Sequence, residues 1–168
     1  VMLFTGFLES GKTKFIQETL EDKRFNDKEK TLLIVCEEGI EEYEPEKFSG
    51  KNVFIKVIEE EEELTKELLE KIAEESNAER AMIEYNGMWD NTKFVDEIFI
   101  DQWQVVQILT TISAETFDLY YNNMRGQFVY HVTGSDLVIV NRCDENTKKY
   151  PIRGSIKSLN PMCQINEN

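Results

Sequence analysis

The segment with the clearest chemical meaning is a glycine-rich loop near the start of the chain, Gly6 to Thr13, which reads GFLESGKT. It matches the pattern G-x-x-x-x-G-K-[ST] and directly follows the apolar run from Val1 to Thr5. In such a loop the glycines let backbone N–H groups turn toward phosphate groups, and the following helix adds the positive end of its dipole. A glycine-rich turn without a ligand is the alternative, but a full match directly behind a strand favours phosphate binding.

The side chains of this loop have separable roles. Lys12 offers a mobile positive charge to the β- and γ-phosphates of a nucleotide, and Thr13 offers a hydroxyl group to Mg²⁺. Glu9 places a carboxylate where glycine is commonest, so both its charge and its Cβ are expected to weaken binding. The other loop residues that we expect to contact the nucleotide are Gly6, Ser10, Gly11 and Lys14.

Polar residues also follow three later apolar runs. The run Thr31 to Cys36 leads into Glu37, the run Arg80 to Tyr85 contains Glu84, and the run Leu137 to Asn141 leads into an Asn-x-x-Asp sequence. Open α/β sheets bind their ligands at the carboxyl ends of the strands. We therefore expect these three segments to lie beside the glycine-rich loop.

The pattern of apolar runs predicts one α/β domain over residues 1–168, with a doubly wound, mostly parallel sheet. Continuous rather than alternating hydrophobicity is typical of strands that are covered on both faces. A helix is predicted from Glu61 to Glu75, where leucine and isoleucine recur at four-residue spacing, and strands alternate with helical segments along the chain. The expected strands are Val1 to Thr5, Thr31 to Cys36, Asn52 to Ile58, Arg80 to Tyr85, Val105 to Ile112, Leu137 to Asn141 and Met162 to Ile165.

The order of these segments resembles the CobW/HypB/UreG family of P-loop GTPases, and the CobW branch most closely. The resemblance covers nearly the whole chain and implies bound GTP and Mg²⁺. It implies that Glu37 is the carboxylate of a switch segment, and that Glu84 and Gly87 lie near Mg²⁺ and the γ-phosphate. Asn141 and Asp144 match the pair that recognises guanine, because a carboxylate accepts two hydrogen bonds from the N1 and N2 edge of that base.

The resemblance adds two further residues to the expected site and has three departures. A late Leu-Asn-Pro segment brings Asn160 into the expected nucleotide contacts, and Arg142 stands where the family's base motif has lysine. Lys14 replaces a second threonine. Metal-handling members carry Cys-x-Cys-Cys between the switch and the Glu84 segment, whereas this chain has no cysteine from Glu37 to Arg142.

These observations predict a GTP-binding protein with slow, Mg²⁺-dependent hydrolysis, in which Lys12, Glu37 and Glu84 are the catalytic residues and Thr13, Glu37 and Glu84 hold Mg²⁺. The sequence leaves open which carboxylate orients the attacking water. Two alternatives remain open: a nucleotide-dependent switch that does not hydrolyse GTP, and an ATP-specific P-loop enzyme. A switch would act through a protein client or a C-terminal domain outside this chain.

Composition narrows the possible partners. The net charge of −14 and pI of about 4.6 disfavour general binding to nucleic acid or to anionic membranes. The three cysteines do not form a close pair, and the sequence has no signal peptide or long apolar span. This pattern predicts a reduced, cytoplasmic protein. Because the chain begins without Met inside an apolar run and stops just after another, we expect it to be part of a longer protein.

Three remaining features are interpreted as structural. The acidic run Glu59 to Glu63 is expected to be a solvated segment that complements the dipole of the helix behind it. Cys36, beside Glu37 and Glu38, could belong to a remnant metal site, but a single cysteine that ends an apolar strand is more often a core residue. His131 is the only histidine, and we expect it to have a packing or surface role.

Overall fold

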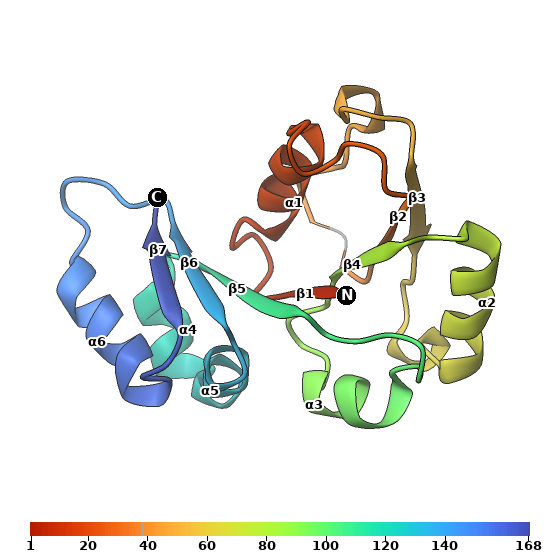
Figure 1. The fold of residues 1–168 in the computed structure, drawn as a ribbon. Coiled ribbons are helices and arrows are strands. Elements are labelled where there is room, and N and C mark those ends of the chain that lie inside the picture. Colours follow the sequence, from red (N-terminus) through yellow and green to blue (C-terminus); the bar gives the residue numbers. More distant parts are fainter. Residues whose placement is uncertain (38) are drawn as a thin grey trace.

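The computed structural model describes residues 1–37 and 39–168. Within them, seven parallel strands form one sheet in the order β3-β2-β4-β1-β5-β6-β7 (Figure 1). The doubly wound α/β fold expected from the apolar runs is confirmed, and the sheet of the described residues is parallel throughout. The strands are β1 Met2–Thr5, β2 Thr31–Val35, β3 Val53–Val57, β4 Arg80–Glu84, β5 Gln107–Ser113, β6 Leu137–Asn141 and β7 Gln164–Glu167.

Helices cover both faces of this sheet. They are α1 Lys12–Glu21, α2 Lys66–Ser76, α3 Asn91–Lys93, α4 Phe117–Asn123, α5 Arg125–Thr133 and α6 Lys149–Leu159. The short helix α3 continues into a π-helical turn, Phe94–Ile98, and two 3₁₀ turns occupy Pro45–Lys47 and Glu61–Glu63. None of the helices among the described residues is long and apolar enough to span a membrane.

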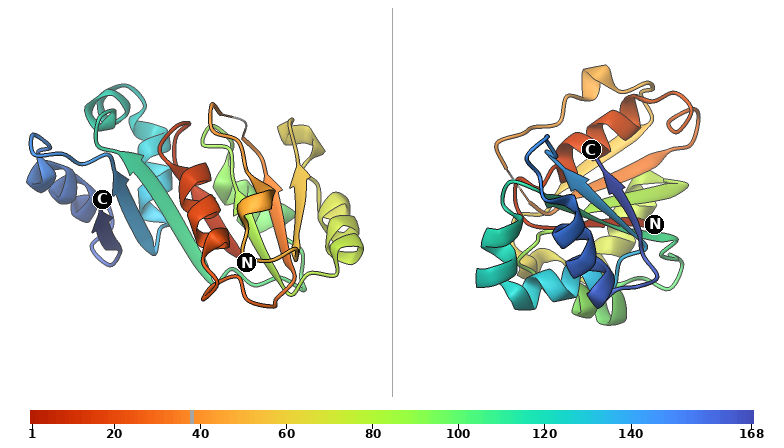
Figure 2. Two further views of the ribbon diagram at one scale, coloured as in Figure 1. Left: turned by 90° about the horizontal axis from the view of Figure 1, so that it is seen from above. Right: turned by 90° about the vertical axis from the view of Figure 1, so that its left-hand side faces the viewer.

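The two faces of the sheet bury different sets of side chains. On one face Ile16 and Leu20 of α1 pack on a cluster that includes Phe4, Met82 and Leu109. The other face packs against α2, α5 and α6 and the turn that follows α3. Seen from above, α1 lies over the middle of the sheet, with strands of the two halves on either side of it (Figure 2, left). Burial on both faces explains why the strands appear in the sequence as continuous apolar runs.

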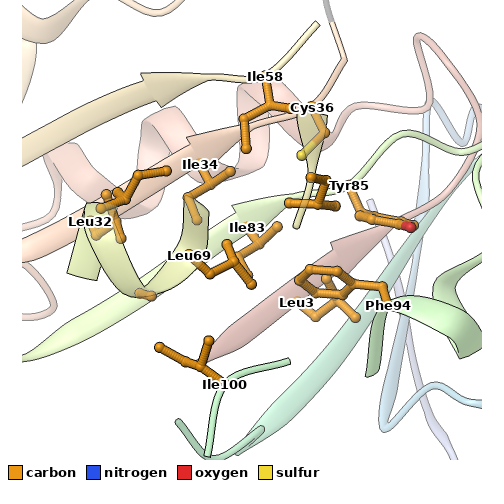
Figure 3. Close-up of a cluster of buried hydrophobic side chains, with 13 residues drawn as sticks. Leu3, Leu32, Ile34, Cys36, Ile58, Leu69, Ile83, Tyr85, Phe94 and Ile100 are labelled. Atoms are coloured by element: carbon orange, nitrogen blue, oxygen red, sulfur yellow. The ribbon is translucent and has the colours of Figure 1, made fainter. Parts of the chain in front are cut away.

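One end of the second face is filled by a cluster that contains Cys36 (Figure 3). Cys36 is 2% exposed and lies among Ile34, Ile58 and Tyr85. Burial, together with the nearby carboxylates, raises the pKa of its thiol to about 12. Cys36 therefore packs as a small apolar residue in this structure.

The helix predicted from Glu61 to Glu75 begins later than expected. The first three of those residues form the separate 3₁₀ turn, in which Glu60 and Glu63 cap each other's backbone. Thr65 then adopts an extended backbone, and its hydroxyl accepts a hydrogen bond of 3.2 Å from the amide of Leu68. This N-cap starts α2 at Lys66, so the acidic run lies before the helix and not in its first turn.

Strand β1 lies between β4 and β5, and the chain reverses its direction of winding there. The carboxyl ends of β1, β4 and β5 are consequently adjacent, with Glu84 in register with Phe4 and with Val35 of β2. This is the edge at which open α/β sheets bind ligands.

Candidate functional site

The glycine-rich loop curls tightly between β1 and α1. Gly6, Glu9 and Gly11 all have positive φ angles, of 126°, 62° and 100°. A Cβ at Gly6 would collide with the carbonyl of Thr111, and one at Gly11 would collide with the amide of Asn141. Both glycines are thus required by conformation and by space. Glu9 adopts the left-handed region at a cost that glycine would avoid.

Two neighbouring strands fix the outer part of this loop. The hydroxyl of Ser10 lies 2.6 Å from that of Thr111 on β5, and the Ser10 carbonyl accepts a hydrogen bond of 2.9 Å from Nδ2 of Asn141 on β6. The Oδ1 atom of Asn141 in turn accepts a bond of 3.2 Å from Asn168. Ser10 and Asn141 therefore hold the shape of the loop.

Lys12 is folded back over the loop that it follows. Its Nζ donates to the carbonyl oxygens of Gly6 and Phe7 at 2.6 and 2.9 Å, and lies 2.6 Å from Oε2 of Glu37. The other carboxylate oxygen of Glu37 accepts a bond of 3.4 Å from the amide of Gly87. A buried anionic group thus lies between the loop lysine and the Gly87 amide.

A second polar contact joins α1 to β4. The hydroxyl of Thr13 donates to Oε1 of Glu84 at 2.7 Å, and the phenol of Tyr43 donates to Oε2 at 2.5 Å. Burial raises the pKa of Glu84 above its ordinary value, although the hydrogen bonds from Tyr43 and Thr13 and the charge of Lys12 oppose that shift. Burial beside Glu84 also raises the pKa of Tyr43. Both oxygens of the Glu84 carboxylate therefore have hydrogen-bond donors.

Gly87 lies directly against the backbone of the glycine-rich loop. A Cβ at this position would collide with the carbonyl group of Gly6 and come within 3.1 Å of the Cα of Phe7. The carbonyl oxygen of Gly87 lies 2.9 Å from Nε2 of His131 on α5. The glycine three residues after Glu84 is thus needed for close approach of two backbone segments.

Two of the hollows at this edge of the sheet are lined by Gly11 of the glycine-rich loop. The smaller, of about 140 Å³, is bordered by Glu9, Lys12, Thr13, Glu37 and Glu84, together with Arg142. The wider one, of about 530 Å³, continues past Gly11 and is lined by Lys14, Asn141 and Arg142. In the first, Lys12 and Arg142 supply positive charge for phosphates beside the carboxylates of Glu9, Glu37, Glu41 and Glu84. The second has room for the rest of a nucleotide.

The match to a known family agrees with this geometry. The family model described as the CobW/HypB/UreG nucleotide-binding domain matches residues 1–167. The chain belongs to the CobW/HypB/UreG family. Membership confirms the resemblance carried by the loop and by the three strand ends, and it makes this a nucleotide-binding domain.

Several solved structures share this fold. The hydrogenase maturation factor HypB from Archaeoglobus fulgidus is 16% identical, with a TM-score of 0.69, over 100% of this chain and 80% of its own. The Zn(II)-bound YjiA GTPase from E. coli is 18% identical, with a TM-score of 0.66, over 98% of this chain and 55% of its own. A Zn(II)-bound triple mutant of YjiA is 17% identical, with a TM-score of 0.69, over 99% of this chain and 56% of its own. This chain thus spans just over half of the length of YjiA. The search of curated protein sequences found no match to this chain.

Most of the residues expected from the sequence meet at this edge. Among the described residues, Gly6, Ser10 and Gly87 belong to the loop and its backbone neighbours without lining either hollow, and Asp144 and Asn160 line neither of them. Asp144 is exposed in the loop after β6, where its Oδ1 accepts hydrogen bonds from Asn146 and Thr147. That position leaves it at the rim, three residues beyond Asn141.

Asn160 lies at the opposite edge of the sheet, which corrects its expected place at the nucleotide. Its amide donates to the carbonyl oxygens of Val132, Thr133 and Ser135 at 2.8, 3.4 and 2.8 Å. Helix α6 carries the chain back from the carboxyl end of β6 to the start of β7, so a residue that follows α6 reaches the amino edge. Asn160 ties the end of α5 to the start of β7, and we remove it from the candidate site.

Tyr43 and His131 belong to the site's surroundings, although no pattern in the sequence indicates it. Tyr43 stands alone in an acidic segment, and His131 lies in a helix far from every motif, so no spacing rule finds either. Among the described residues, no group of three or more His, Cys, Asp or Glu side chains is arranged to hold a metal ion. Glu38, part of the alternative site at Cys36, lies outside the described residues.

Proposed function

We propose that this domain binds GTP with Mg²⁺ and hydrolyses it slowly. The observation that carries the proposal is the Glu37 carboxylate, which lies between Nζ of Lys12 and the amide of Gly87. The site therefore has the donors for an anionic group in the place where a P-loop protein receives the terminal phosphate. In the nucleotide-bound state, a phosphate group replaces the carboxylate at these donors.

The residues at the end of β4 fit a magnesium site. Mg²⁺ prefers hard oxygen ligands and commonly uses one or two carboxylates together with substrate phosphates. Thr13 and Glu84 offer a hydroxyl and a carboxylate that are already 2.7 Å apart, beside the loop. When bound, the ion neutralises charge that develops on the transferring phosphoryl group.

The two carboxylates then have different roles. Because Glu84 is fixed by Thr13, we assign it to the metal site. Once a phosphate displaces Glu37 from Lys12, the Glu37 carboxylate is free to orient the attacking water. Lys12 and the loop amides then stabilise the transferring phosphoryl group. Turnover by these groups alone is expected to be slow, because P-loop GTPases gain much of their rate from an added arginine.

Guanine recognition rests on Asn141, Arg142 and Asp144. Asn141 supports the loop through Ser10, and Arg142 borders both hollows with a positive φ of 59°. Asp144, at the rim, would accept two hydrogen bonds from the N1 and N2 edge of guanine. The stem of Arg142 would lie along the base where the family has lysine.

A switch that does not hydrolyse GTP is the second candidate, and one observation favours it. The segment after β2 contacts both Lys12, through Glu37, and Glu84, through Tyr43. A Mg²⁺-nucleotide that uses Lys12 and Glu84 must displace both contacts, which changes the shape of this segment. A C-terminal domain or a protein client would detect that change.

Calorimetry with Mg²⁺-GTP and Mg²⁺-ATP tests the proposal. We expect GTP to bind more tightly than ATP, and Lys12→Ala to weaken GTP binding by at least about 100-fold, because it removes the charge for the β- and γ-phosphates. Lys23→Ala, an exposed lysine beyond α1, is the control for the loss of one positive charge. Unchanged affinity in Lys12→Ala would refute the site. Phosphate release then separates a GTPase from a switch, and equal binding of ATP would favour the ATP-specific alternative.

A further inference from the structure

His131 is a buried polar group that the proposed mechanism does not use. It is the only histidine of the chain, lies in the last turn of α5, and is 5% exposed. Its Nε2 lies 2.9 Å from the carbonyl oxygen of Gly87. Because a carbonyl oxygen can only accept, Nε2 carries the proton and donates it. Burial lowers the pKa of His131 to about 4, so the ring is neutral near neutral pH.

Neighbouring residues hold both the backbone and the ring of His131. The backbone carbonyl of His131 accepts hydrogen bonds from Thr110 at 2.8 Å and from Ser135 at 2.5 Å. The ring meets the phenyl ring of Phe7 edge-on, with centroids 4.8 Å apart, and Phe7 itself stacks on Tyr120 at 4.0 Å. The Nε2–H group is therefore held in one direction, toward Gly87.

Gly87 needs such an anchor. A glycine has more backbone freedom than any other residue, yet this one must keep its N–H directed at the anion position beside Lys12. That N–H donates to Oε1 of Glu37, whose other oxygen pairs with Lys12. The hydrogen bond from His131 to the Gly87 carbonyl restricts rotation of the backbone on one side of Gly87. Close packing on the backbone of Gly6 restricts its movement toward the loop.

We propose that His131 is a positioning residue that holds the Gly87 amide toward the terminal phosphate and so contributes to the preference for GTP over GDP. The inference rests on the proposed function, because it takes the Glu37 carboxylate to lie where that phosphate binds. His131 acts only through Gly87 and contacts no nucleotide. A diphosphate lacks the group that this amide receives, so loss of the anchor weakens triphosphate binding selectively.

Three variants separate this role from packing. His131→Leu keeps an apolar side chain but removes the donor, whereas His131→Gln keeps an N–H donor on a side chain of similar reach. Val132→Ala is the matched control, because Val132 is fully buried in the same helix and packs in the cluster that contains Phe7. It lowers stability without removing the bond to Gly87.

Affinities for a non-hydrolysable GTP analogue and for GDP, both with Mg²⁺, are measured by calorimetry, and thermal unfolding of each variant is recorded. We expect His131→Leu to lose about three- to tenfold in affinity for the GTP analogue and less than about twofold for GDP, the effect of one hydrogen bond. His131→Gln restores most of the preference, and Val132→Ala lowers the melting temperature with an unchanged ratio.

The positioning role would be overturned in favour of packing if His131→Leu lost equal affinity for both nucleotides. The same conclusion would follow if Val132→Ala changed the ratio of the two affinities as much as His131→Leu does. Failure of His131→Gln to recover the ratio would overturn the positioning role as well. If the unsubstituted chain binds neither nucleotide, the proposed function itself fails, and that result is separate from a changed ratio in a chain that binds both.

Discussion

Nζ of Lys12 and Oε2 of Glu37 lie 2.6 Å apart, and their side chains are only 2% and 8% exposed. A buried pair of this kind loses the hydration of both charges, so its geometry and its further hydrogen bonds decide whether it is stable. Here Lys12 also reaches two loop carbonyls, and Glu37 also reaches the Gly87 amide. The carboxylate thus competes with any phosphate for the same donors.

Glu37→Gln should change binding and hydrolysis in opposite directions. Without the competing charge, the affinity for a non-hydrolysable GTP analogue is expected to rise by about three- to tenfold. Phosphate release under saturating GTP is expected to fall by about 10- to 100-fold, because no carboxylate then orients the attacking water. Calorimetry and a phosphate assay measure the two effects. Glu46→Gln, an exposed carboxylate on the turn Pro45–Lys47, controls for net charge. A parallel loss of affinity would instead indicate that Glu37 holds Mg²⁺.

The contact between Lys12 and Glu37 also marks the limit of what the sequence could predict. The loop Gly6 to Thr13 is a local motif, and the strands are local apolar runs, so both were predictable. The pairing of Glu37 with Lys12 and of His131 with Gly87 depends on which segments the fold brings together, and no local pattern encodes that.

The two wrong predictions, the start of α2 and the place of Asn160, have physical causes. Thr65 starts α2 because its hydroxyl caps the helix, a signal that a count of leucines and isoleucines overlooks. Asn160 was assigned to the nucleotide only by resemblance, with no chemical reason for its side chain. Its three backbone acceptors lie at the amino edge of the sheet, so the connection after α6 decides its role.

Asp144→Asn tests the assignment of the base. The amide keeps an oxygen that can accept from Asn146 and Thr147, so the loop after β6 is expected to hold its shape. GTP affinity should fall by at least about tenfold, and xanthosine triphosphate should bind better than GTP, because the edge of xanthine pairs with an amide. Competition against a fluorescent guanine nucleotide measures both. Glu145→Gln, an exposed neighbour, is the control. An unchanged preference would exclude Asp144 from base recognition.

Zinc is expected to bind this domain only loosely. A closed zinc site needs several clustered donors and deprotonated thiols. The chain lacks the Cys-x-Cys-Cys sequence, and the thiol of Cys36 is buried in an apolar cluster with a raised pKa. Titration against a zinc chelator of known affinity, with and without GTP, measures the binding. Stoichiometric zinc that survives the chelator and disappears in Cys36→Ser, but not in Cys143→Ser, would contradict this and restore a metal-carrying role.

His131 should make the stability of the domain fall as the solution becomes acidic. Burial is the main cause that lowers its pKa to about 4; the charge of Lys12 adds to the shift, and the hydrogen bond to Gly87 opposes it. The unfolded chain, with an ordinary histidine pKa of about 6.5, binds the proton first, so the free energy of unfolding declines as the pH falls from about 6.5 toward 4. The full loss is about 3 kcal/mol, of which about 1 kcal/mol is expected at about pH 5.5.

Urea unfolding of the unsubstituted chain and of His131→Gln, at about pH 7.5 and about pH 5.5, isolates this contribution from that of the carboxylates, which both proteins share. Glutamine does not titrate, so the difference in unfolding free energy between the two proteins should shift by about 1 kcal/mol in favour of the variant at the lower pH. A difference that stays constant between the two conditions would mean that His131 is protonated in the folded state at about pH 5.5. It would then have two donors near the loop, and the neutral ring inferred beside Gly87 would be wrong.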